Sequence, residues 1–504
     1  MKKISRSRFL PLQLSLFFLI SFSLAACDSQ NFGELQYEEE RIRTIILTDM
    51  THDDGNSLIR YLYYASYFDL EALIVTNQLP DFDYDETGPW DKAMGILDAY
   101  REELPQLRKH DPDLPGYEEL MEVTKQGRGS IPIIWLTNTL EFSGQIADRF
   151  VTSEWDSVYF HDWIGEGYTP NNEPKDSEGS DFLVEVFEKD DGRPIFVQAW
   201  GGTITFVQAL HRFREKHGEE KFQELLPKLH LYGILFQDIS FEYFADFEKM
   251  QSETCAGFGT AIPTFGEEPV ELGMVLYEND HFWYYVWNHH GQPDWQMPLT
   301  SRDVNGHGPL SDIYDDGGEG DTPSYLYLLS SVFGLNDPFD PTQGSWGSMF
   351  RPMGDSFPDR YYSTCDVGLT ELTRWIPAAT NSFLNRLQWP VKDPGEVNRE
   401  PVAVLNGDQS AKIIRLKGSP GEVITLDASN SYDPDDDELT FHWFRYEEAD
   451  SYTGAVNISD PENTIQQITI PEDLEEANIH IVLELKDDGE PALTSYRRVI
   501  IETL

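Results

Sequence analysis

Apolar segments without regular polar alternation recur through the first half of the chain, and helical patterns separate them. Strands that are apolar on both faces are typical of a parallel sheet covered by helices on both sides. The predicted strands are 42–49, 70–76, 131–137, 194–199 and 229–236. Helical periodicity is clearest at 57–68 and 203–216. The pattern predicts an α/β domain with a mostly parallel, open sheet and helices on both of its faces.

The predicted strands end on polar residues or on a glycine turn. In chain order, these endings are Asp49, Asn77 with Gln78, Asn138, the turn 200–202, and Gln237 with Asp238. Ligands of open α/β sheets bind beyond the carboxyl ends of the strands. Single Asn or Asp residues at such positions are often only turn formers. A succession of five such endings nevertheless favours a polar site along one edge of the sheet.

Beyond the stretch 390–395, which contains proline and glycine, short β-type segments separated by turns replace the helical patterns. Such a succession indicates a small β-sandwich, and segment 424–446 resembles the immunoglobulin-like modules of bacterial surface proteins. We therefore predict an α/β domain at 41–392 and an all-β immunoglobulin-like sandwich at 393–504. The acidic run 433–437 is interpreted as a solvated turn, with calcium binding as the alternative.

The N-terminus has the pattern of a secretory signal. A basic segment with Lys2, Lys3, Arg6 and Arg8 precedes a mostly apolar stretch at 10–24 and small residues before Cys27. This pattern resembles a bacterial lipoprotein signal at 1–27, in which Cys27 is lipidated, followed by an acidic tether at 28–40. An ordinary cleaved signal is the alternative. We predict a protein of the bacterial cell envelope, periplasmic or on the cell surface, that is attached to the membrane through Cys27.

Composition limits the possible partners. The formal net charge is −52, which argues against nucleic-acid binding because that interaction needs clusters of Lys and Arg. Clefts lined by carboxylates instead attract cations. Apart from Cys27, only Cys255 and Cys365 are present, without zinc-site spacing, and their distance in the sequence leaves a disulfide open.

The stretch 45–58, IILTDMTHDDGNSL, places three aspartates where a predicted strand gives way to a helix. Like charges this close repel, and calcium is a cation that binds several carboxylate oxygens at once. Asp49, Asp53 and Asp54 are therefore candidate metal ligands. The alternative is an acidic turn in which Asp54 or Asn56 caps the helix.

The same stretch resembles the N-terminal fingerprint of the nucleoside hydrolase superfamily, Asp-x-Asp-Pro-Gly-x-Asp-Asp. Its last three aspartates match Asp49, Asp53 and Asp54, whereas Leu47 replaces the first aspartate and the Pro-Gly pair is absent. Further motifs are similar to one branch, secreted nucleoside hydrolase-like proteins, some labelled cellulose-binding, with a C-terminal immunoglobulin-like module. They are GEG at 165–167, KDSEGS at 175–180, WGGTIT at 200–205, HGPLSDIY at 307–314, EGDTPSYLYLL at 319–329 and GSWG at 344–347.

This resemblance implies a nucleoside hydrolase-like fold and a Ca²⁺ site. The implied metal ligands are Asp49, Asp53, Asp54, Asp321 and the backbone carbonyl of Trp200. In the family, the aspartate matching Asp49 also acts as general base on the metal-bound water. The implied reaction is hydrolysis of an N-glycosidic bond through an oxocarbenium-like transition state.

The resemblance is less complete for substrate binding. Asp53 matches a ligand that also contacts ribose hydroxyls, and Asn77 corresponds to a sugar-binding asparagine. Many nucleoside hydrolases have a histidine that protonates the leaving base where this chain has Gly320. His307 and Glu319 are candidate substrate-binding residues and acids, with ordinary loop residues as the alternative.

Two functions follow as hypotheses. The first is a calcium-dependent hydrolase of N-glycosyl, nucleoside-like or related glycosyl bonds, acting on a small-molecule glycosyl compound or a carbohydrate. The second is a non-catalytic envelope lipoprotein that binds a polysaccharide with the same fold. The full set of aspartates favours the enzyme, and the missing acid favours the binding protein. The sequence leaves a homo-oligomer possible.

Overall fold

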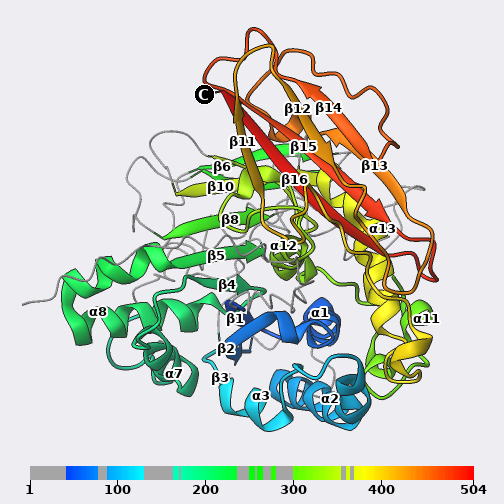
Figure 1. Cartoon of the computed structure of the whole chain (residues 1–504). Helices are drawn as coiled ribbons and strands as arrows, with labels where there is room; N and C mark the ends of the chain where they lie inside the picture. Colours follow the sequence, from blue (N-terminus) through cyan, green and yellow to red (C-terminus); the bar gives the residue numbers. More distant parts are fainter. Residues whose placement is uncertain are drawn as a thin grey trace, which may run out of the picture. The chain divides into compact units, whose positions relative to one another are not determined.

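The computed structural model describes residues 41–77, 88–129, 163–169, 172–234, 249–255, 258–264, 274–279, 299–352, 359–363 and 368–503. An eight-stranded sheet in the order β3-β2-β1-β4-β5-β8-β10-β9 organises the α/β part (Figure 1). Its strands are β1 (Ile42–Thr48), β2 (Phe68–Val75), β3 (Thr124–Gln126), β4 (Ile195–Ala199), β5 (Leu229–Ile234), β8 (Val275–Asn279), β9 (Phe350–Pro352) and β10 (Arg360–Ser363). A separate hairpin pairs β6 (Lys249–Cys255) with β7 (Phe258–Thr264).

The sheet is parallel except at its β9 edge, where β9 pairs with β10 in antiparallel register. The chain builds β1, β2 and β3 outward on one side, and then crosses over to place β4 and β5 on the other side of β1. A topological switch point therefore lies between β1 and β4, and such a point is where open α/β sheets bind ligands. Leu47 pairs with Ile74 of β2 and with Ala199 of β4, so the carboxyl ends of these strands are aligned.

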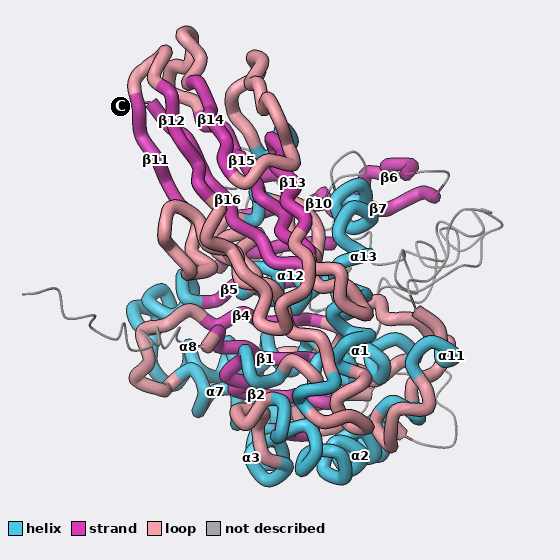
Figure 2. The backbone as a smooth tube through the Cα atoms, turned by 45° about the vertical axis from the view of Figure 1, so that its right-hand side comes forward, coloured by secondary structure: helices cyan, strands magenta, loops and turns pink. Residues whose placement is uncertain are grey.

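Helices cover both faces of the sheet (Figures 1 and 2). They are α1 (His52–Leu62), α2 (Pro89–His110), α3 (Tyr117–Val123), α7 (Glu178–Phe187), α8 (Thr203–Leu225), α11 (Ser301–Val304), α12 (Thr322–Val332) and α13 (Gly368–Arg386). Short 3-10 helices are η1 (Ala65–Tyr67), η3 (Leu226–Lys228), η4 (Ser311–Ile313), η5 (Pro341–Gln343), η6 (Pro394–Glu396) and η7 (Glu447–Ala449). The arrangement confirms the predicted fold class.

Successive side chains of β1 point to opposite faces of the sheet and pack in two different hydrophobic cores. Ile46 packs on the face that α1, α2, α12 and α13 cover, while Ile45 and Leu47 pack on the face of α7 and α8. All three side chains are fully buried, because a central parallel strand is covered on both faces. The unbroken apolar run of this segment therefore reflects its central position in the sheet.

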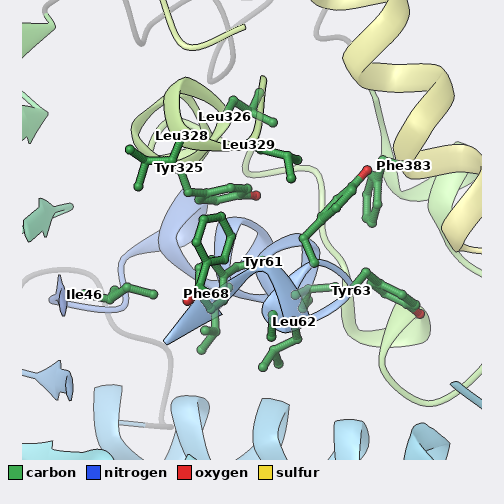
Figure 3. Packing of buried hydrophobic residues seen from close by; sticks show 14 of the residues in the cluster. Ile46, Tyr61, Leu62, Tyr63, Phe68, Tyr325, Leu326, Leu328, Leu329 and Phe383 are labelled. Atoms are coloured by element: carbon green, nitrogen blue, oxygen red, sulfur yellow. The ribbon is translucent and has the colours of Figure 1, made fainter. Parts of the chain in front are cut away.

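Aromatic side chains join α1 to its neighbours (Figure 3). The Tyr61 ring stacks on Phe68 with centroids 5.2 Å apart and meets Tyr325 of α12 edge-on at 5.4 Å. Tyr63 meets Phe383 of α13 at 5.8 Å. Edge-on and offset contacts of this kind add to the stabilisation from buried area. They fix α1 against the two helices that follow much later in the chain.

Several predicted element boundaries were wrong. The first helix begins at His52 and not at 57, so the aspartate pair lies inside its first turn, where negative charge is favoured. It also ends earlier, at Leu62 and not at 68, because η1 follows at 65–67 and β2 begins at Phe68. The helix predicted at 203–216 runs on to Leu225, with a break at Gly218, which has φ +79°. The predicted strand 131–137 lies outside the described residues.

The C-terminal part consists of two sheets, as predicted for a sandwich. One has the order β11-β16-β15-β13 and the other pairs β12 with β14. The strands are β11 (Ile414–Gly418), β12 (Val423–Asp427), β13 (Thr440–Arg445), β14 (Ile465–Thr469), β15 (Asn478–Lys486) and β16 (Thr494–Thr503). Trp443 of β13 is buried in the core of this part, and its indole N–H donates to the carbonyl of Asn463 at 2.9 Å.

This C-terminal part shares a core with the α/β part. The Trp375 ring of α13 meets Tyr446 and Tyr496 edge-on, with centroids 6.1 and 5.4 Å apart. Trp346 donates from its indole N–H to the Tyr496 hydroxyl at 3.3 Å. All four side chains are buried and belong to the same hydrophobic cluster as α1. The α/β part and the C-terminal part therefore belong to one compact unit, 41–504, and the boundary at 392/393 stays a prediction.

No helix among the described residues combines the length and the apolar character needed to cross a membrane.

Because of the shared core, we expect the chain to unfold in a single transition. Trp375→Ala should lower the free energy of unfolding by about 3–5 kcal/mol, since it leaves a cavity in that core. Tyr432→Ala, at a side chain that is 48% exposed, is the control and should change it by less than about 1 kcal/mol. Denaturant unfolding followed by tryptophan fluorescence and circular dichroism measures both. Two separate transitions, of which Trp375→Ala moves only one, would contradict this expectation.

Candidate metal centre

The loop between β1 and α1 carries three of the predicted ligands. Asp49 directly follows β1, and Asp53 and Asp54 lie in the first turn of α1. Between them, Met50 has a φ of +55°, which is uncommon for a residue other than glycine. This left-handed residue turns the chain sharply, so that only a short loop separates Asp49 at the end of β1 from Asp53 and Asp54 in the first turn of α1.

Asp321, far along the chain, joins this loop. Carboxylate oxygens of Asp53, Asp54 and Asp321 all lie within 4.8 Å of one another. Asp54 and Asp321 are each 1% exposed, and Asp53 is half-buried. Neither carboxylate oxygen of Asp321 accepts a hydrogen bond from the described part of the chain. Asp49, also buried, brings a fourth carboxylate near the other three.

Burial and mutual repulsion both act on the titration of this cluster. Burial first, and then the charges of Asp54, Asp53 and Asp49, hold the pKa of Asp321 well above its ordinary value. Burial and the charge of Asp54 raise the pKa of Asp53 to about 7. Burial also raises the pKa of Asp54, although hydrogen bonds from two threonines oppose the change. Carboxyl groups with raised pKa values in this arrangement need a cation when they ionise.

The residues present fit a calcium ion. The clustered ligand atoms are carboxylate oxygens, and Ca²⁺ takes about six to eight oxygen ligands. The Asp321 oxygens are buried acceptors without a donor, an arrangement that costs free energy unless a positive charge approaches. No histidine or cysteine belongs to this group in the described part of the chain, and zinc sites usually contain them.

Three residues that sequence reasoning missed support the loop. The hydroxyls of Thr48 and Thr51 both donate to Asp54, the second at 2.8 Å. Lys92, at the start of α2, donates to the backbone carbonyls of Met50 and Thr51 at 3.3 and 3.0 Å. The threonines lie inside the motif and were recognisable as hydroxyl donors. Lys92 gave no signal, because only the folded chain brings α2 to this loop.

The turn after β4 closes on Asp49. The backbone N–H of Trp200 donates to the carbonyl of Leu47 at 2.9 Å, which aligns the turn with the end of β1. A Cβ at Gly201 would lie 2.3 Å from Asp49 Oδ2, and one at Gly202 would lie 2.3 Å from Thr76 Oγ1. Only glycine allows approaches this close. Trp200, whose carbonyl was predicted as a ligand, thus lies beside Asp49.

Polar side chains of α1 hold the segments on both sides of Asp321. Asn56 donates to the carbonyl of Gly318 at 2.8 Å. Arg60, fully buried, pairs with Glu319 at 2.7 Å. Beyond Asp321, the hydroxyl of Thr322 donates to that of Ser57 at 3.1 Å. The helix that supplies two of the carboxylates therefore also positions the third.

The structure does not bring every predicted site residue to the cluster. Glu319 is occupied by the buried ion pair with Arg60. The His307 ring lies 2.8 Å from the carbonyl of Val304, in a loop anchored on Glu103 of α2 through the backbone N–H of Leu310. The rise of α2 places Glu103 about 16 Å along the helix from Lys92, whose side chain contacts the loop of the cluster.

Asn77 is exposed at the edge of the sheet that carries the cluster. It directly follows Thr76, whose backbone N–H donates to the carbonyl of Thr48 at 2.9 Å. Besides Asp53 itself, Asn77 is therefore a predicted sugar contact that lies near the carboxylates. Cys27 lies outside the described residues, as does Cys365.

The stability of the calcium-free protein should fall as the pH rises. Asp53 has a pKa of about 7 in the folded chain against an ordinary value of 3.8, so the folded state holds its proton more tightly than the unfolded state. The free energy of unfolding is therefore expected to decrease by about 1–3 kcal/mol between pH 4 and pH 7. Thermal melts in chelator at several pH values measure this. Added calcium should reverse the trend, and Asp53→Asn should flatten it, whereas a melting temperature that rises with pH in chelator would contradict it.

Gly201→Ala should displace Asp49, because the new Cβ would overlap its carboxylate. Changes of this kind next to a metal ligand typically weaken metal affinity about 10–100-fold. Gly192→Ala is the matched control, since a Cβ there meets open space. Calcium titration calorimetry of both variants tests the expectation, which equal affinities would refute.

Two family models match the chain. The family described as cellulose-binding Sde182, nucleoside hydrolase-like domain, matches residues 43–350, and cellulose-binding protein Sde0182, C-terminal domain, matches 423–503. No curated protein matches the sequence.

Among solved structures, a nucleoside hydrolase-related protein from Saccharophagus degradans, associated with carbohydrate metabolism, is 28% identical, with a TM-score of 0.70. That match covers 92% of this chain and 100% of the other. The plant nucleoside hydrolase PpNRh1 is 12% identical over 69% of this chain and 99% of its own, with a TM-score of 0.30. The family and fold predicted from the motifs are confirmed: the chain belongs to the cellulose-binding Sde182 family with a nucleoside hydrolase-like domain.

Proposed function

We propose that the protein is a calcium-dependent glycosyl hydrolase whose centre consists of Asp49, Asp53, Asp54 and Asp321. The observation that carries this proposal is the convergence of three carboxylates within 4.8 Å, two of them buried, at the switch point of the sheet. Burying several like charges without a counter-ion is strongly unfavourable. A site that only held a neutral sugar would have no need of them.

The aspartates differ in their surroundings, and this suggests different roles. Asp54 receives hydrogen bonds from two threonine hydroxyls and is the anchoring ligand. Asp321, without a donor, depends on the ion most directly. Asp53 is half-buried, so it would be able to contact both the ion and the substrate. When bound, calcium supplies positive charge that lowers the pKa of water and orients sugar hydroxyls.

Asp49 is the proposed general base. Its Oδ1 accepts from the backbone N–H of Thr51 at 3.3 Å, and its Oδ2 lies against Gly201. These contacts fix the carboxylate in one orientation, which a base needs in order to take a proton from an attacking water. Asn77, exposed at the same edge, would contact the sugar.

The residues available to protonate the leaving group indicate which substrates the enzyme would prefer. Gly320 stands where many nucleoside hydrolases have an acid, and neither His307 nor Glu319 reaches the cluster among the described residues. We therefore expect the fastest cleavage for glycosyl compounds whose leaving group departs without protonation. The cellulose-binding description of the family and the carbohydrate association of the Saccharophagus degradans protein both favour a carbohydrate. The predicted lipid anchor at Cys27 would place the enzyme where such compounds reach the cell surface.

The test is an assay of the calcium-loaded protein on nitrophenyl glycosides, nucleosides and cello-oligosaccharides. We expect turnover on nitrophenyl ribosides first, and a loss of about 10²–10⁴-fold in Asp49→Asn, as for removal of a general base. Asp190→Asn, at an exposed position, controls for the change of charge. Turnover that survives in Asp49→Asn would refute the assigned base.

The name of the family supports a second candidate, a cellulose-binding protein without catalysis. Binding of cello-oligosaccharides with no cleavage of any substrate, in the presence of calcium, would replace the enzyme proposal with this one.

A further inference from the structure

Three segments that contain none of the residues of the carboxylate cluster meet at one end of the C-terminal part. They are the turn 433–437 before β13, the turn 487–491 between β15 and β16, and Asn398, which follows α13 and η6. The amide of Asn398 donates to Asp487 Oδ1 at 3.1 Å and to the carbonyl of Pro491 at 2.9 Å. The backbone N–H of Glu438 donates to Asp488 at 2.8 Å. These bonds hold the three segments together.

Each buried aspartate uses one oxygen to organise its own turn. Asp433 Oδ1 accepts from the backbone N–H groups of Asp435 and Asp437 at 2.7 and 3.2 Å. Asp487 Oδ1 accepts from those of Gly489 and Leu493 at 3.0 and 2.8 Å. The turns therefore need only one carboxylate oxygen from each residue.

The second oxygen of each aspartate is buried and has no donor. Asp433 is 7% exposed and Asp487 is 3% exposed, yet Oδ2 of each accepts no hydrogen bond from the described residues. Asn398 Oδ1 is in the same situation. The amide nitrogen of Asn398 is already committed to Asp487 and Pro491, so exchanging its oxygen and nitrogen would break two bonds. Three acceptors thus lack a donor around one small region.

The neighbouring cation, Arg399, is not the missing partner of these three oxygens. The guanidinium of Arg399 is engaged by Asp435 and by the carbonyl of Pro434. Burial, and then mainly the charge of Asp433, Asp488 and Asp435, raises the pKa of Asp437. The field at this end of the sandwich is therefore negative.

We propose that Asn398, Asp433 and Asp487 bind a calcium ion at this end of the C-terminal part. All three offer oxygen, the ligand atom that Ca²⁺ prefers, and water would complete the coordination. A bound ion gives each donorless oxygen a partner and ties the segment after α13 to both turns. This site is independent of the proposed catalytic centre.

Calcium titration calorimetry of the purified protein, with Mg²⁺ in parallel, tests the proposal. We expect two calcium ions per chain in the wild type and one in Asp54→Asn, which leaves the second site intact. Asp433→Asn and Asp487→Asn should each also bind one ion, at the catalytic centre. Both substitutions keep an Oδ1 acceptor for the turn, and the pair guards against one variant failing to fold. Asp436→Asn, exposed in the same turn, is the matched control and should bind two.

Several results would overturn the proposal. One ion in the wild type that disappears in Asp54→Asn would show that the C-terminal oxygens hold only water. A second ion retained in both Asp433→Asn and Asp487→Asn, or lost equally in Asp436→Asn, would place it elsewhere. Equal affinity for Mg²⁺ would contradict the assignment to calcium. A single ion in the wild type that survives in Asp54→Asn and is lost in Asp433→Asn would support this site and refute calcium binding at the catalytic centre.

Discussion

Repulsion among four carboxylates at the end of β1 is the constraint around which the α/β part is arranged. Asp49, Asp53, Asp54 and Asp321 converge where the chain crosses from one half of the sheet to the other. Left alone, they would push the loop, α1 and α12 apart. Hydrogen bonds from threonines, a lysine on the backbone carbonyls and the polar face of α1 oppose that force. These contacts hold the four carboxylates close together despite their repulsion, and a binding site for a divalent cation requires such an arrangement.

The sequence was sufficient for the fold class, the central strands and three of the clustered aspartates, and the family resemblance added the fourth, Asp321. Buried parallel strands are continuous apolar runs, and the aspartates around the end of β1 occur in a motif that differs from a plain turn. The start of α1 was misjudged because Asp53 and Asp54 were taken as residues before the helix. Their place in its first turn depends on the helix N-terminus favouring negative charge.

Other features had no local signal. Lys92 and the α1 contacts around Asp321 arise from packing between segments far apart in the chain. Glu319 illustrates the same limit, because the sequence left it as either a substrate contact or an ordinary loop residue, while its carboxylate pairs with Arg60 in the interior. Position close to a candidate metal ligand in the sequence says little about which way a side chain points. The Asn398 contact with the turn at 487 was likewise invisible, although the acidic run at 433–437 was noticed.

The shared core of the two architectures also determines how the C-terminal part can be used. Carbohydrate-active proteins often carry binding modules on linkers, which can be cut off or fused to another host. Here Tyr446 and Tyr496 are buried against Trp375 and Trp346, so a detached sandwich would expose a broad aromatic surface to water. It would associate or precipitate instead of serving as a portable module. An engineer who grafts the sandwich onto another protein must therefore carry α12 and α13 along.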